Sequence, residues 1–413
     1  MLKPKPLLPQ LPARRDLLLA AACALACLAI PRLAQAQSPA FQNWVNRFRP
    51  KALARGVSEA TFDRVMSALK PDTSVYDLLN NQDEFNEQLW QYLNRRVSDF
   101  RIVAGKERAK ELEGLLSRLE QDYGVDRYIL LSLWGNESSY GDVIDNPKYM
   151  RPIIPALAAL AFGAPRRRPY WEQELINALR VVERGWATPD QMIGSWAGAM
   201  GHTQWMPEVW LNVGVDYDKD GRISPFGKPD DALAGTAKFL LNRGDYQKGV
   251  AWGHEVKVPS GLKRRNARTY SKWADAGVTR ADGKPFPRGG DKAQLQVPVP
   301  GGPAFLVGQN FKAVMSYNPA FSYALAVCHL ADRIRGDGPF IQKFPGGERA
   351  LTVAEMQELQ RRLTTAGFDT GGADGRAGRD TMRAVRAFQK KVGLDPADGY
   401  PGLTVLARLR KDA

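Results

Sequence analysis

A single glutamate lies in an otherwise apolar stretch of the sequence, LSLWGNESSYG at residues 131–141. Leu130, Trp134 and Glu137 follow one another at spacings of four and three, which place them on one face of an α-helix. The pattern therefore points the carboxyl group of Glu137 toward the core. Burial disfavours the charged form of a carboxyl group and raises its pKa, as a general acid requires. A structural glutamate near a helix end is the alternative that these residues leave open.

A second stretch, GSWAGAMGHTQWMPEVW at residues 194–210, combines small residues and tryptophans with few polar side chains. Glycines let the backbone approach a ligand closely, and aromatic rings suit the apolar faces of sugars. Gln204 and His202 would supply the polar contacts. The composition favours a saccharide site, although a helix start packed with small residues would look similar. The aromatic walls of such a site would be Trp196, Trp205 and Trp210.

Alternating aspartates form a third motif in DYDKDGRISPFGKPDDAL, residues 216–233. Three aspartates and a glycine match the first six positions of an EF-hand calcium loop, but the twelfth position is Gly227 instead of glutamate. The loop must therefore be longer, and Asp231 or Asp230 would close it. A solvated turn is the alternative. We expect a structural Ca²⁺ ion and no organic cofactor; the candidate ligands in the loop 216–231 are Asp216, Asp218, Asp220, the carbonyl of Arg222, and Asp231.

The elements that must position these groups are mainly helical by their pattern. Apolar residues recur at spacings of three and four through 38–135 and again through 321–334. Alternating patterns with dense glycine and proline are confined to about 250–310, which predicts a small insert carrying a β-hairpin. The sequence thus predicts a mainly α (α+β) fold for the domain at 37–335.

The C-terminal residues form a separate module by their composition. Residues 336–350 are rich in glycine, proline and charge, as a linker is, and residues 351–413 contain an internal repeat. A-D-G-x-x-G begins at position 373 and again at 397, each time as a turn signal beside an apolar-periodic segment. Two similar turns predict a small bundle of three helices.

The first 36 residues are typical of a signal peptide for export. A basic start precedes the apolar run LLLAAACALACLAI, which at 14 residues is too short to span a bilayer comfortably, and AQA at 34–36 offers a cleavage site. The Arg14–Arg15 pair leaves a twin-arginine route open, and Cys27 is a poor match to a lipid-attachment site. We therefore expect a periplasmic protein that retains one cysteine, Cys328, and no internal disulfide.

The formal net charge of +14 limits the classes of partner. A basic surface suits nucleic acid, an anionic membrane or an acidic polymer, and export argues against nucleic acid. The three histidines, at 202, 254 and 329, are too far apart in the sequence to indicate a zinc site.

Five stretches occur in the order typical of one family: GVDRYILLSLWGNESSYG, GSWAGAMGHTQWMP, the aspartate loop followed by DAL, GPAFLVGQNF, and YNPAFSYALAVCHLADRI. Together they resemble membrane-bound lytic murein transglycosylase B and its soluble relatives over residues 38–335. In the C-terminal module, ELQRRL, the two ADG turns and AVRAFQ resemble the peptidoglycan-binding domain often attached to these enzymes.

The resemblance implies a lysozyme-like fold and cleavage of the MurNAc–GlcNAc bond of peptidoglycan. It implies a single catalytic residue, Glu137, in the E-S-x-Y-G context, and a calcium loop at 216–231. The chain departs from the family at His202 and Trp205, where Gln and Phe are usual, and at Phe239, where a tyrosine is common. The substrate-binding residues that the resemblance carries over are Ser195, Gln204, Tyr317, Asn318 and Tyr323.

A single acid requires a nucleophile other than the second carboxylate that ordinary glycosidases use. The N-acetyl group of MurNAc can support the cationic centre, and its 6-hydroxyl can attack to give a 1,6-anhydro product. Glu137 would first protonate the leaving oxygen and then deprotonate that hydroxyl. Two alternatives stay open: a non-catalytic wall-binding protein, and a hydrolytic muramidase that uses Asp142 or Asp145. The expected partners are peptidoglycan glycan strands, with cell-wall synthesis or secretion complexes as further candidates, and we expect a monomer.

Overall fold

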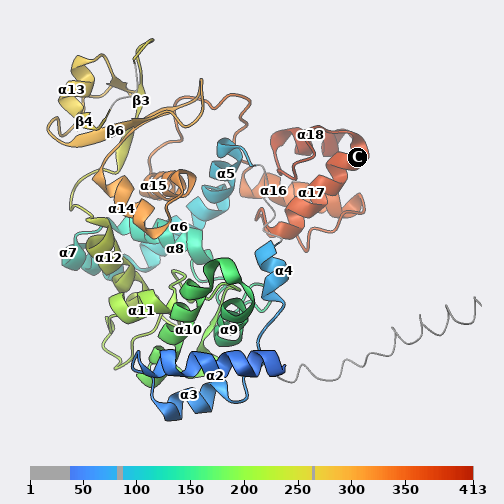
Figure 1. Cartoon of the computed structure of the whole chain (residues 1–413). Coiled ribbons are helices and arrows are strands. Elements are labelled where there is room, and N and C mark those ends of the chain that lie inside the picture. Colours follow the sequence, from blue (N-terminus) through green and yellow to red (C-terminus); the bar gives the residue numbers. More distant parts are fainter. Residues whose placement is uncertain (1–37, 81–86, 263–265, 413) are drawn as a thin grey trace, which may run out of the picture.

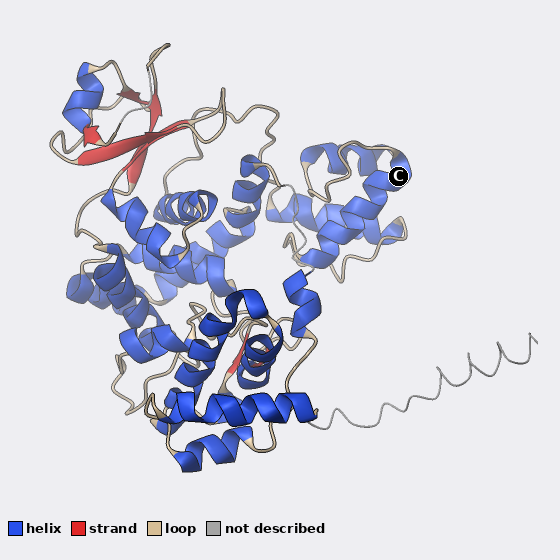
Figure 2. Cartoon of the chain, viewed as in Figure 1, coloured by secondary structure: helices blue, strands red, loops and turns tan. Residues whose placement is uncertain are grey.

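The computed structural model describes residues 38–80, 87–262 and 266–412 (Figure 1). The signal peptide predicted at 1–36 lies outside the described residues. Helices dominate and the strands are few and short (Figure 2), which confirms the mainly α class predicted from the sequence. In the part of the chain that the structure describes, no helix is both long and apolar enough to cross a membrane.

One helical lobe forms around α9 (Ile153–Gly163), which lacks a polar face and is buried on nearly every side. Its core contains stacked aromatic rings from the first described helix, such as Trp44 on Phe48 at 5.0 Å between ring centroids. The other elements of this lobe are α2 (Pro39–Leu53), α3 (Glu59–Met66), α4 (Val75–Asn80), α10 (Arg168–Glu183), α11 (Pro207–Val213), the 3₁₀ turns η1 (Pro165–Arg167) and η2 (Pro189–Gln191), and the paired strands β1 (Arg151–Pro152) and β2 (Ile193–Gly194).

A second lobe has its own apolar core, built around α8 (Arg127–Ser138) and α15 (Phe321–Arg335). The apolar stripe of α8 is buried completely at Leu130 and Leu133, as its spacing predicts. Packed around this pair are α5 (Leu89–Arg96), α6 (Asp99–Glu111), α7 (Glu113–Tyr123), α12 (Asp230–Gly244) and α14 (Gln309–Tyr317).

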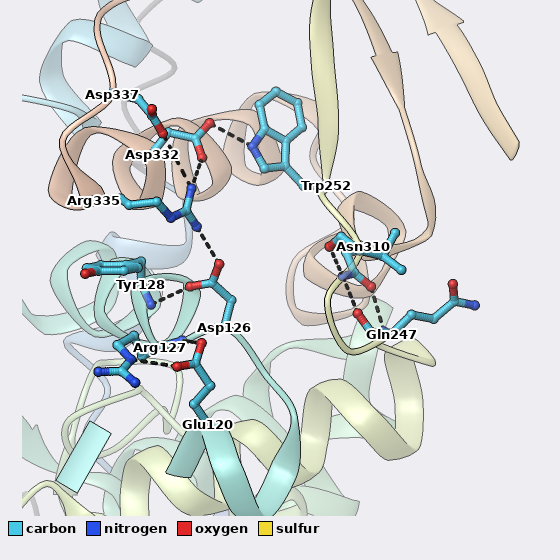
Figure 3. Close-up of polar contacts among 11 residues, drawn as sticks. Glu120, Asp126, Arg127, Tyr128, Gln247, Trp252, Asn310, Asp332, Arg335 and Asp337 are labelled. Carbon is cyan, nitrogen blue, oxygen red and sulfur yellow. Dashed lines mark hydrogen bonds and ion pairs between the residues drawn. The ribbon is translucent and has the colours of Figure 1, made fainter. Parts of the chain in front are cut away.

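The helices α8 and α15 run antiparallel and are joined along their length. At the start of α8, Asp126 forms an ion pair with Arg335 from the end of α15, and Arg335 also pairs with Asp332 at 2.8 Å (Figure 3). Halfway along, the hydroxyl of Ser132 donates a hydrogen bond to the carbonyl of Val327 at 2.6 Å. The C-terminal end of α8 therefore lies beside the N-terminal end of α15.

A five-stranded antiparallel sheet projects beyond this lobe, with strand order β4-β6-β7-β3-β5 (Figure 1). Its small core includes Val256, Trp273 and Leu306, all of them fully buried. The sheet is larger than the predicted hairpin, because a third strand pairs beside the β6–β7 hairpin and two short strands are added at the edges. Its elements are β3 (Gly253–Lys257), β4 (Arg268–Thr269), α13 (Tyr270–Asp275), β5 (Thr279–Arg280), β6 (Lys292–Gln296) and β7 (Ala304–Val307).

The C-terminal module is a three-helix bundle with a separate apolar core: α16 (Val353–Thr365), α17 (Arg379–Val392) and α18 (Leu403–Lys411). Its two repeated turns are held in the same way. In each turn a glutamine of the preceding helix donates to the aspartate and accepts from the glycine amide. Gln360 holds Asp374 and Gly375, both at 2.9 Å, and Gln389 holds Asp398 at 3.0 Å and Gly399 at 2.8 Å.

The module is docked on the second lobe. Its Arg376 pairs with Asp142 at 2.5 Å, just after α8, and Asp380 pairs with Lys148 nearby. The second repeated turn contacts α5, whose side chains Trp90, Gln91 and Asn94 reach Tyr400 and Asp398. The connection at 336–350 also packs against its surroundings, since Phe340 stacks on His329 with ring centroids 3.8 Å apart.

Candidate active site

Glu137 lies at the C-terminal end of helix α8. The helix begins after Asp126, whose carboxylate accepts a hydrogen bond from the amide of Tyr128 at 2.8 Å. It ends at Ser139, which adopts the left-handed conformation with φ of 53°. Gly135 is required in the last turn, because a Cβ there would lie 2.5 Å from the ring of Tyr140.

Glu137 is partly buried, and the hydroxyl of Tyr323 donates a hydrogen bond to its Oε1. Burial raises the pKa of Glu137, and this effect outweighs the opposing effects of the Tyr323 hydrogen bond and the positive charge of Arg96. The group therefore holds its proton at a higher pH than an exposed glutamate, as the sequence pattern predicts.

Two tyrosines face the acid from other helices. Tyr323 lies on α15 and Tyr317 at the end of α14; burial and the nearby charge of Glu137 raise the pKa of both phenols. Both therefore stay protonated and can only donate or accept hydrogen bonds. The hydroxyl of Tyr317 donates to the carbonyl of Thr203, which attaches the 194–205 loop to the same region.

The remaining predicted substrate-binding residues lie on the two loops beside these tyrosines. The hydroxyl of Ser195 accepts from the amide of Ala199 at 3.1 Å. Gln204, with φ of 54°, donates from its amide to the carbonyl of Gly201 at 3.0 Å. Asn318 is exposed between α14 and α15. None of the three forms a described hydrogen bond with Glu137, so only Tyr323 contacts the acid directly among the predicted set.

The prediction of aromatic walls was wrong for two tryptophans. Trp205 and Trp210 are only 1% and 0% exposed, because both pack in the core of the first lobe. The indole of Trp205 donates to the hydroxyl of Thr236 at 3.3 Å. Only Trp196 is partly exposed. The departure from the family at Trp205 therefore changes the core and not a surface that a sugar could touch.

His202 connects the catalytic helix to the aspartate loop. Its Nδ1 accepts a hydrogen bond from the indole of Trp134 at 3.1 Å, and its Nε2 donates to the carbonyl of Gly227 at 2.8 Å. Burial lowers the pKa of His202, so the ring is neutral in this arrangement. This second departure from the family is thus a structural link.

Three carboxylates of the aspartate loop converge. Oxygen atoms of Asp216, Asp218 and Asp231 lie within 4.8 Å of one another. Hard oxygen donors of this kind suit Ca²⁺ or Mg²⁺. Asp231, and not Asp230, belongs to this group, whereas Asp220 is exposed and accepts a hydrogen bond from the amide of Arg222 at 2.9 Å.

Two arginines at this site were missed by the sequence reasoning. Arg96 donates to the carbonyl of Asn136 at 3.1 Å, and Arg101 donates to the carbonyl of Gly135 at 3.1 Å. Both therefore reach the last turn of α8. No local pattern could reveal them, since they lie about forty residues before the motif on other helices.

The two aspartates that follow α8 differ from Glu137 in their surroundings. Asp142 and Asp145 are exposed, and Asp142 is paired with Arg376 of the C-terminal module. Glu137, in contrast, is partly buried.

Comparison with known proteins gives two family matches. The model of the transglycosylase SLT domain matches residues 40–332, and that of the putative peptidoglycan binding domain matches residues 352–409. Membrane-bound lytic murein transglycosylase B from Escherichia coli is 28% identical over 313 residues, which cover 72% of this chain and 83% of that protein.

Solved structures are similar over a larger part of the chain. SltB3 from Pseudomonas aeruginosa, determined in complex with NAG-NAM-pentapeptide and with NAG-anhNAM-pentapeptide, is 37% identical; the match covers 90% of this chain and 100% of that one, with a TM-score of 0.70. The lytic transglycosylase SLT35 from Escherichia coli in complex with calcium is 27% identical and covers 73% of this chain and 94% of that one, with a TM-score of 0.60.

Proposed function

We propose that this chain, which belongs to the transglycosylase SLT family, uses Glu137 as the single acid and base of its reaction. As a member of that family it is a peptidoglycan lytic transglycosylase, which cleaves the MurNAc–GlcNAc bond without water and forms 1,6-anhydroMurNAc. The observation that carries the assignment of Glu137 is its partly buried carboxyl group with a raised pKa, which Tyr323 holds at the end of a buried helix.

The reaction needs Glu137 in both protonation states. In the first step the protonated carboxyl gives its proton to the glycosidic oxygen as the bond to C1 of MurNAc breaks. The N-acetyl group of the substrate supports the cationic centre. In the second step the carboxylate takes the proton of the 6-hydroxyl as that oxygen bonds to C1, which restores the acid. The raised pKa of Glu137 supports the first step, since the acid must hold a proton before the substrate binds.

We assign glycan binding to the polar groups around the acid. Their match to the motifs of the family supports this assignment, as does their arrangement on two loops and two helices that meet near Glu137. The enclosed phenols stay neutral and so can donate hydrogen bonds to sugar hydroxyls. The residues are Ser195, Gln204, Tyr317, Asn318 and Tyr323.

We propose that the converging carboxylates of Asp216, Asp218 and Asp231 hold a structural Ca²⁺ ion. The calcium complex of SLT35 supports this choice of ion. Added Ca²⁺ is expected to raise the melting temperature, and a chelator to lower it, because a ligand that binds only the folded state stabilises it by about 2.7 kcal/mol at a hundred times its Kd. A melting temperature that changes with neither Ca²⁺ nor the chelator would contradict the proposed Ca²⁺ site.

The periplasm is the proposed location, where the substrate of such an enzyme lies. The C-terminal module is expected to bind peptidoglycan on its own, since it has a separate core and matches a peptidoglycan binding domain. Isolated residues 351–413 should therefore pellet with purified sacculi, whereas the chain without them should pellet less. A folded module that stays in the supernatant would leave it only a packing role against α5.

A further inference from the structure

Glu137 occupies an unfavourable position for a carboxylate. It lies in the last turn of α8, where the backbone carbonyls give the helix end a partial negative charge. Burial of the carboxyl group acts in the same direction, since both effects favour the protonated form. Without an opposing charge, the acid would release its proton to the glycosidic oxygen only at a high cost in free energy.

Arg96 supplies positive charge at this helix end. It is the last residue of α5, and its guanidinium donates to the carbonyl of Asn136, the residue before Glu137, at 3.1 Å. Its side chain also lies over the ring of Tyr92, at 5.6 Å from the ring centroid. The charge of Arg96 lowers the pKa of Glu137.

Arg101 also binds the last turn of α8, through a backbone carbonyl. Its guanidinium donates to the carbonyl of Gly135 at 3.1 Å and to that of Arg95 at 2.9 Å. Burial lowers its own pKa to about 9, so Arg101 is also a cation at neutral pH. Its hydrogen bond to α8 lies one carbonyl further from Glu137 than that of Arg96. Both arginines cap the helix, and Arg96 is the one that binds the carbonyl next to Glu137 and lowers the pKa of that acid.

We propose that Arg96 is a positioning residue that balances the charge of Glu137 and keeps its carboxylate form accessible during the reaction. This inference rests on the proposed role of Glu137 as acid and base. Arg96 itself neither gives nor takes a proton: the proton leaves Glu137 for the glycosidic oxygen and returns to it from the 6-hydroxyl. The guanidinium stabilises the state between these two transfers.

The described groups that face Glu137 are few enough to isolate this effect. Tyr323 faces it from α15, Tyr317 from α14 and Arg96 from α5. The two phenols are neutral, so the charges at this helix end come from Arg96 and Arg101, and Arg96 binds the carbonyl nearer to Glu137. The helix that carries it is held from its other side by the C-terminal module, through Gln91 and Asp398 at 2.6 Å.

The test compares pH–rate profiles on soluble glycan fragments for Arg96→Gln, Arg96→Lys and the control Arg95→Gln. Arg95 neighbours Arg96 but pairs with Glu87. Loss of the charge raises the pKa of Glu137, so the fall in rate at high pH should move upward by about one unit in Arg96→Gln. Arg96→Lys and Arg95→Gln should keep the wild-type profile. The proposal would be overturned if the rate of Arg96→Gln falls at the same high pH as the rate of the wild type.

A second measurement does not depend on activity. Arg96→Gln should lower the melting temperature more at pH 8 than at pH 5 in the wild-type chain, and by less in a Glu137→Gln background, which has no charge to balance. Equal losses in both backgrounds at both pH values would mean that Arg96 only caps the helix. The proposed role of Glu137 has its own test: it would be contradicted if the single variant Glu137→Gln keeps its activity, whatever the result for Arg96.

Discussion

Glu137→Gln is expected to lower the rate of release of soluble fragments from sacculi by two to four orders of magnitude, or more, which is the range for loss of a general acid and base. The amide keeps the shape of the side chain but has no transferable proton. Tyr323 can still donate its hydrogen bond to the amide oxygen. The loss should therefore fall on the chemical step and leave glycan binding close to normal.

The same substitution should not destabilise the fold. Because burial raises the pKa of Glu137 in the folded state, its contribution to stability is present at low pH and is lost as the pH rises through that pKa. A neutral glutamine resembles the protonated acid at every pH. Glu137→Gln should thus melt with the wild type in acid and above it at neutral pH and beyond.

Asp142→Asn is the matched control for this experiment. It also converts an acid near the end of α8 into an amide, but at an exposed side chain paired with Arg376. We expect activity within a few-fold of the wild type and an unchanged 1,6-anhydro product. A folded Glu137→Gln enzyme with near wild-type activity would refute the assignment. A loss of activity in Asp142→Asn, together with a hydrolysed product, would point to a second carboxylate.

The catalytic helix could be predicted from the sequence because its signals are local. The spacing of Leu130, Trp134 and Glu137 predicts which way the carboxyl group points. In the structure Leu130 and Trp134 are buried and Glu137 is partly buried on the same helix. The repeated turns of the C-terminal module were visible for the same reason. Each is built by a short motif and a glutamine on the helix just before it.

The partners of the acid could not be predicted from spacing, since they come from distant segments. Tyr323 lies 186 residues after Glu137 in the chain, and only the resemblance to a family identified it as a candidate site residue. Arg96 had no such support and was missed. Trp205 shows the opposite error. The composition of the stretch around it suits a sugar site, but a tryptophan among small residues suits a packed core equally well. In the structure Trp205 lies in the core.

The aspartate loop left one choice open, because its length departs from the pattern that the first six positions match. Convergence in three dimensions selects Asp231 over Asp230. The carboxylate of Asp231 also accepts hydrogen bonds from the amides of Tyr217 at 2.7 Å and Ser224 at 2.9 Å. It therefore ties the two halves of the loop together whether or not an ion is bound.

Asp231→Ala is accordingly expected to reduce the free energy of unfolding by about 2–6 kcal/mol, because it leaves the amides of Tyr217 and Ser224 without an acceptor, at about 1–3 kcal/mol each. The response of the melting temperature to Ca²⁺ should disappear as well. Asp220→Ala is the matched control from the same motif: its exposed carboxylate lies outside the converging group, so its variant should keep both the stability and the calcium response. Urea unfolding of the three chains, with Ca²⁺ and with a chelator, measures both quantities. Equal losses of stability and of calcium response in the two variants would mean that Asp220 is also a ligand, as the EF-hand pattern suggests, and would contradict a site made by Asp216, Asp218 and Asp231 alone.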